Sequence, residues 1–111
     1  MKIARRQQNG VTILDLSGKI TIGVCDVALR RAVQDEIGNG SLNLLLNCAS
    51  VTTIDSSGIG ELVSSYTTTQ HRGGKLKLLS PPPKVQDILT ITQLISIFEI
   101  HEDEKEAVAS F

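Results

Sequence analysis

The sequence predicts a single small α/β domain spanning residues 1–111, built on a mixed sheet of four to five strands with about four helices. The chain is long enough for one hydrophobic core and contains no internal repeat and no dividing linker. Short β-branched or leucine-rich runs alternate along it with stretches of helical period. Such alternation is typical of a sheet whose strands are connected by helices.

The first half of the chain is predicted to contain strands around one helix. Residues 11–16 are largely β-branched or apolar, which predicts a strand. Gly18 is expected to turn the chain, so that residues 19–22 form a short partner strand. Apolar side chains recur at three- and four-residue steps over residues 25–37, which predicts a helix. Residues 42–48 include three successive leucines, which suits a strand covered on both faces.

The second half continues the alternation. Residues 75–79 predict a further strand, and the three prolines at 81–83 predict a stiff loop that leads into a helix over residues 84–92. Residues 96–100 are expected to form the last strand, and residues 102–109 a short last helix. The local acidic excess near the C-terminus is explained by a solvated helix.

A helix between these halves is predicted from near Ser57 to near His71. The spacing i, i+3, i+4, i+7 predicts a buried stripe of Ile59, Leu62, Val63 and Tyr66. At about 100° per residue, the outer side that carries Ser57 also carries Glu61, Ser64, Ser65 and Thr68. Ser57 is therefore expected to be exposed at a helix start. The predicted core comprises Ile59, Leu62, Val63, Leu44, Leu46, Ile13, Leu29 and Val33.

Composition narrows the classes of function. Aromatic residues make up only 3% of the chain, so the core must be aliphatic and stacking platforms for single-stranded nucleic acid are not expected. The net charge of −1 argues against a nucleic-acid partner. No apolar run approaches the length of a membrane span, and the N-terminus lacks the apolar stretch of a signal peptide. We expect a cytoplasmic protein without membrane insertion, in which Cys25 and Cys48 are reduced and buried.

The sequence Asp55-Ser56-Ser57-Gly58, called here the Asp-Ser-Ser-Gly motif, is the most informative stretch of the chain. Asp and Ser start helices because their side-chain oxygens accept hydrogen bonds from the free N–H groups of the first turn. A hydroxyl at that position meets the partly positive end of the helix, which favours a phosphate. The motif can therefore be a helix cap with small residues for tight packing, or a phosphate-bearing site.

The motif and its flanks resemble the STAS domain of bacterial anti-sigma factor antagonists. Ile54-Asp55-Ser56-Ser57-Gly58-Ile59-Gly60 matches the family's acceptor loop at every position. Three more segments follow in family order, over roughly residues 11–109. They are Leu16-Ser17-Gly18-Lys19-Ile20, Gly73-Gly74-Lys75-Leu76-Lys77-Leu78 and the closing stretch from Val85 to Phe98. The resemblance implies a STAS-like fold for the whole chain.

The resemblance also implies a function. Ser57 would be the phosphoacceptor of an anti-sigma factor serine kinase, and the unphosphorylated protein would bind that kinase and so release a sigma factor. A phosphatase is a further candidate partner, and no cofactor is implied. The chain would be a kinase substrate and not an enzyme. Partner-binding positions would be Thr21, Asp55, Ser56, Gly58, Gly60, Glu61 and Ser64.

Two positions depart from the family pattern. Thr21 stands where many phosphorylatable relatives carry an acidic residue, and Asn47 stands where an aspartate is frequent. A second function therefore stays open: a STAS module that binds a nucleotide or an anion, or that scaffolds a larger signalling complex, with Ser57 unmodified. Neither the kinase nor the sigma factor can be named from the sequence.

Catalytic and metal-binding patterns are weak. His71 and His101 have no His or Cys partner at metal-binding spacing. Val63 occupies the position at which a dinucleotide-binding fingerprint starting at Gly58 needs its third glycine. No residue is placed as a base next to Ser57 in the way that a serine hydrolase requires.

Overall fold

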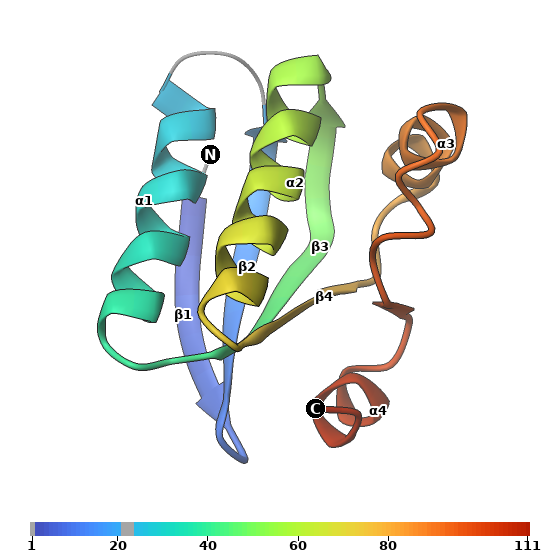
Figure 1. Ribbon diagram of the computed structural model, residues 1–111. Coiled ribbons are helices and arrows are strands. Elements are labelled where there is room, and N and C mark those ends of the chain that lie inside the picture. The colour runs from blue at the N-terminus through green and yellow to red at the C-terminus, as the bar shows by residue number, and fades with distance from the viewer. Residues whose placement is uncertain (1, 21–23) are drawn as a thin grey trace.

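The computed structural model describes residues 2–20 and 24–111, and for residues 24–26 the backbone alone (Figure 1). It is an α/β domain with one five-stranded mixed sheet in the order β1-β2-β3-β4-β5. β1 is antiparallel to β2, and all other neighbours are parallel. In chain order the elements are β1 Lys2–Gln8, β2 Val11–Ile20, α1 Val24–Gly38, β3 Asn43–Ile54, α2 Ser56–His71, β4 Lys75–Leu79, α3 Pro83–Ile91, β5 Ile100–His101 and α4 Glu104–Ala109.

Both faces of the sheet are covered. α1 and α2 lie side by side over one face, as Figure 1 shows, and the larger apolar cluster fills the space between them and the strands. A smaller cluster on the other face includes Ala107 and Val108 of α4. Leu44 and Leu46 belong to the first cluster and Leu45 to the second, because successive side chains of a strand point to opposite faces. The prediction that this leucine run is a strand covered on both faces is confirmed.

The eight predicted core residues are buried with one exception. Leu62 is 0% exposed, and only Val63 remains partly exposed, packed against the rim of the larger cluster. Cys48 is a buried free thiol whose pKa is raised to about 12 by desolvation. The Cys25 side chain lies outside the described residues. None of the helices in the described part of the chain is long and apolar enough to cross a membrane.

Two of the predicted strands are corrected by the structure. Residues 96–98 form turns after α3, and β5 consists of Ile100–His101 alone, paired with Leu78 and Leu79. Lys19 and Ile20 do not start a partner strand, because β2 continues through Gly18 and pairs with β3. Gly18 has a φ of +96° and lies at a shift of register between these strands. It therefore accommodates an irregularity in the strand and not a reversal of the chain.

β1 has no counterpart among the predicted strands. Most of its side chains are exposed, so it lacks the apolar alternation that marks a half-buried strand. A two-residue turn at Asn9-Gly10, with φ values of 52° and 81°, folds β1 back onto β2. Positive φ at both central residues matches a turn that favours Asn-Gly in β-hairpins. This dipeptide was the signal in the sequence from which the strand could have been found.

Candidate functional site

The start of α2 lies directly after the end of β3, and Asp55 is its N-cap. The Asp55 carboxylate Oδ1 accepts a hydrogen bond from the Gly58 backbone N–H at 2.9 Å. The Asp55 carbonyl accepts from the Ile59 N–H at 2.9 Å, which closes the first helical turn. Ser56 and Ser57 are therefore the first and second helical residues. The capping function of the motif belongs to Asp55, and the Ser57 hydroxyl is not the cap.

Gly58 permits the end of β2 to lie against the start of α2. The Asp55 backbone N–H donates to the Ile20 carbonyl at 3.3 Å. A Cβ atom at position 58 would lie 2.9 Å from the Ile20 carbonyl carbon and 2.7 Å from Ile54 Cγ1. Any side chain there would clash with the backbone, so the position requires glycine. Thr21, a predicted partner-binding residue that follows Ile20, lies outside the described residues.

Gly60 is exposed and differs from Gly58 in its surroundings. A Cβ atom at position 60 would meet no heavy atom of the described residues within 4 Å, apart from its own helix backbone and chain neighbours. Packing among the described residues therefore does not require glycine at position 60. Position 60 therefore leaves open space on this face of α2 among the described residues, which a partner could approach closely.

The predicted site residues are unequally accessible. Ser56 and Ser64 are exposed, as is Gly60, whereas Ser57 is partly buried. Ser57 is therefore less exposed than predicted. Glu61 is only 7% exposed, so the expectation that it belongs to an outer surface is wrong. Ser65, predicted on the same side, is also buried.

The reason is that α1 packs beside α2 (Figure 1). Each residue of α2 is rotated by about 100° from the one before it. Viewed down the helix axis, Gly60 and Ser64 therefore lie on one side of Ser57. Glu61 and Ser65 lie on the other side. The second side faces α1. A shallow hollow between the two helices is lined by Arg30, Val33, Gln34, Ser64, Ser65 and Thr68. The helical period predicted for α2 was correct. It could not indicate that α1 covers half of the side of α2 that carries Ser57.

Arg30 of α1 is the functional candidate that sequence reasoning missed. Its guanidinium binds Glu61 through two nitrogen atoms, with Nε donating to Oε2 at 3.1 Å and Nη2 donating to Oε1. The Glu61 side chain is 9% exposed and that of Arg30 is 51% exposed. The fork therefore neutralises a nearly buried carboxylate and ties α1 to α2. No sequence signal marks this pair, because its members are 31 residues apart.

Asn47, the second departure from the family pattern, belongs to another part of the fold. Its side-chain amide donates to Asp15 Oδ1 at 2.8 Å. Arg6 binds the same carboxylate at 2.6 and 2.9 Å, which is the main reason that the pKa of Asp15 is lowered. Asn47 precedes the end of β3 at Ile54 by seven residues, or about 23 Å of strand. Its identity therefore has no direct bearing on the start of α2.

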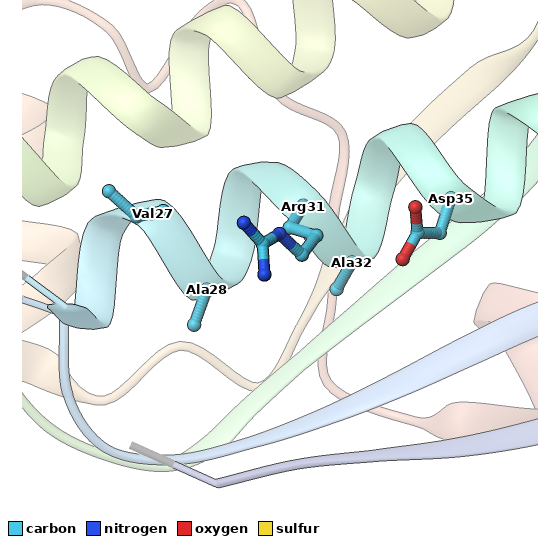
Figure 2. A pocket seen from close by; sticks show the side chains of 5 residues that line it. All are labelled: Val27, Ala28, Arg31, Ala32 and Asp35. Atoms are coloured by element: carbon cyan, nitrogen blue, oxygen red, sulfur yellow. The ribbon is translucent and has the colours of Figure 1, made fainter.

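Two larger hollows lie away from Ser57. One, of about 330 Å³, is lined by one side of α1, and Figure 2 shows its side chains Val27, Ala28, Arg31, Ala32 and Asp35. The other, of about 370 Å³, involves the later turns of α2, where Tyr66 and Gln70 face Lys77 and Glu99. Lys77 and His101 lower the pKa of Glu99 to about 2. The described residues contain no group of three or more His, Cys, Asp or Glu side chains that could hold a metal ion.

Comparison with known proteins assigns the family. The STAS domain model matches residues 2–107. An anti-sigma F factor antagonist from Paenibacillus polymyxa is 25% identical over 109 residues, covering 97% of this chain and 92% of the relative. A provisionally named anti-sigma factor antagonist from Thermotoga neapolitana is 34% identical over 80 residues, or 71% of each chain.

Solved structures agree with this assignment. A provisionally named anti-sigma factor antagonist from Thermotoga maritima is similar with a TM-score of 0.89 at 27% identity, covering 97% of this chain and 92% of that chain. The phosphorylated form of the Bacillus cell fate determinant SpoIIAA gives a TM-score of 0.76 at 18% identity, covering 98% of each chain, which supports the fold alone. The chain is therefore a STAS domain protein and belongs to the anti-sigma factor antagonist family.

Proposed function

We propose that this protein is a phosphorylation-controlled antagonist of an anti-sigma factor. In its unphosphorylated form it binds an anti-sigma factor serine kinase and so releases a sigma factor. The kinase ends the interaction by phosphorylating Ser57. The observation that carries the proposal is the position of Ser57 in the first turn of a helix capped by Asp55, in a chain of the antagonist family.

The surroundings of Ser57 suit the approach of a kinase. Ser56, Gly60 and Ser64 are exposed, and together with Ser57 they form what we call the acceptor face. All four residues are small, so a partner can come close to the helix backbone. Asp55 provides the cap, which leaves the Ser57 hydroxyl available to react without loss of the helix start.

The proposed reaction is a transfer of the γ-phosphoryl group of ATP. A bond forms between the Ser57 oxygen and phosphorus, the bond from phosphorus to the ADP oxygen breaks, and the hydroxyl proton passes to a base of the kinase. The product carries about −1.5 to −2 charges at pH 7. Asp55 is two residues away, so the phosphate adds charge beside an acidic group, whereas the Glu61 carboxylate one helical turn away is paired with Arg30. A loss of about 3 kcal/mol in binding lowers affinity more than a hundredfold.

The test is phosphorylation by a candidate kinase. The full chain is incubated with ATP and an anti-sigma factor kinase from the same genome, preferably one encoded next to it, and the product is mapped by mass spectrometry. We expect one phosphate on Ser57 in the wild type and in Ser56→Ala, and none in Ser57→Ala. Phosphate on Ser56, or none with a kinase shown to be active, would count against the proposal and favour the unmodified STAS module.

Binding to the kinase provides a second measurement. Ser57→Asp adds a charge and is expected to weaken binding, whereas Ser57→Ala adds neither charge nor bulk and is expected to retain it. Calorimetric titration of both variants against the kinase measures the difference. Equal affinity of Ser57→Asp and wild type would contradict control by charge at this position.

A further inference from the structure

The ion pair between Arg30 and Glu61 connects α1 to α2 one helical turn from the proposed phosphoacceptor. We infer that Arg30 is the intramolecular ligand of phosphorylated Ser57, and that its guanidinium transfers from Glu61 to the phosphate when the serine is modified. The inference rests on the proposed function, because it concerns the modified state of the same residue. It adds a second element, α1, to the switch.

The geometry brings the guanidinium within reach of position 57. Ser57 and Glu61 are four residues apart on one helix, so their Cβ atoms are about 6 Å apart. Helical side chains tilt toward the N-terminus of the helix, so the Glu61 side chain leans toward the turn that carries Ser57. Arg30 Nε lies 3.1 Å from Glu61 Oε2. The transfer therefore needs a rotation of one long side chain and no movement of either helix.

The arrangement of the helices also favours this contact. α1 and α2 lie side by side and begin at the same end of the sheet, as Figure 1 shows. Arg30 is the seventh residue of α1 and Glu61 is the sixth residue of α2. The two residues therefore lie at nearly the same distance from the starts of their helices. The Arg30 side chain is 51% exposed, so it is not enclosed by the packing between the helices.

Charge decides which ligand Arg30 prefers. Phosphoserine offers three acceptor oxygens and about −1.5 to −2 charges near pH 7, against −1 for the Glu61 carboxylate. The guanidinium is a planar fork that binds phosphate through two parallel hydrogen bonds. Among the described residues, Asp55 lies two positions from the phosphate, is acidic and already accepts the Gly58 N–H. Arg30 is therefore the cation that offsets the new charge.

The transfer would change the charged side chains that α1 and α2 present at their shared surface. In the unmodified protein the fork holds Glu61 in the groove between α1 and α2. After the transfer, Glu61 loses its partner and the exposed part of Arg30 changes position. A partner that contacts both helices would then detect the phosphate and the loss of the ion pair together.

The experiment does not depend on a kinase. Phosphoserine is incorporated at position 57 by genetic code expansion, and the second pKa of the phosphate is measured by ³¹P NMR in the full chain. The same protein is prepared with Arg30→Gln and, as a matched control, with Arg31→Gln. Arg31 is also exposed on α1, but it lines the hollow of Figure 2 and not the groove beside α2. Loss of a nearby cation is expected to raise the phosphate pKa by about half a unit or more for Arg30→Gln, and by much less for Arg31→Gln.

A second measurement is the ¹H–¹⁵N signal of Arg30 Nε in wild-type protein with and without the phosphate, which is expected to shift on phosphorylation. Equal phosphate pKa values for Arg30→Gln and Arg31→Gln, or an unshifted Nε signal, would overturn the inference. If Arg30→Gln does not fold, the Nε signal of the folded wild type decides. A kinase that leaves Ser57 unmodified would refute the proposed function without affecting these results.

Discussion

Replacing Gly58 by alanine is expected to destabilise the protein, whereas the same replacement at Gly60 is expected to stabilise it. The added Cβ at position 58 would lie 2.9 Å from the Ile20 carbonyl carbon, closer still to its oxygen, and 2.7 Å from Ile54 Cγ1. These contacts are too short to persist. Because the contact with Ile20 is to backbone atoms, the end of β2 and the start of α2 must move apart. At Gly60 the same Cβ meets no described heavy atom within 4 Å outside its own helix backbone and chain neighbours.

The two variants separate helix propensity from packing. Alanine favours a helix interior over glycine by about 0.8–1 kcal/mol, and Gly60→Ala should gain up to that amount. Gly58→Ala has a similar gain, but overpacking in a close-packed site costs about 1–3 kcal/mol, and a backbone contact places it toward the upper end. We therefore expect a net loss of about 1–2 kcal/mol at position 58 and a gap of about 2–3 kcal/mol between the variants.

Urea unfolding followed by circular dichroism measures both variants against wild type under one set of conditions. Equal slopes of the unfolding free energy against urea would show that only stability has changed. If Gly58→Ala proved as stable as wild type while Gly60→Ala showed its expected gain, the close approach of Ile20 to the start of α2 would be refuted.

Three further predictions test other parts of the structure. Leu62→Ala should lose about 2–5 kcal/mol in urea unfolding, because the side chain is 0% exposed, and a loss under about 1 kcal/mol would contradict its burial. Asp55→Ala should lose about 0.5–2 kcal/mol with the helix cap, whereas Ser57→Ala should stay within about 0.5 kcal/mol of wild type; the reverse order in thermal unfolding would identify Ser57 as the cap. The pKa of Glu99 is lowered from 4.5 to about 2, mainly by Lys77, so this carboxylate stabilises the fold above pH 4.5 and the contribution is lost as the pH falls toward 2. Glu99→Gln should therefore flatten the fall in stability over that range, and an unchanged profile from pH 5 to pH 2 would contradict the pairing.

Local signals carried the predictions that succeeded. The start of α2 follows from Asp55 and the small residues after it, because a helix cap depends on atoms within one turn of the chain. The first half of β3 and β4 follow from their leucines, which are buried, whereas β3 continues to Ile54, beyond the predicted residues 42–48. The prediction of a strand over residues 96–100 failed because the local signal there was weak. β5 is a strand of two residues, defined by its pairing with β4 and not by its own composition.

The sequence by itself determined the α/β class, the position of the motif at the start of a helix and the family resemblance. Only the tertiary structure decided which side of that helix is covered. Periodicity shows which residues share a side but not what packs against it, so Glu61 and Ser65 were expected on an outer surface. Their burial depends on α1, and the pairing of Glu61 with Arg30 joins residues 31 positions apart. Such a contact exists only once the strands have set the two helices side by side, because an ion pair between distant residues leaves no pattern in the chain.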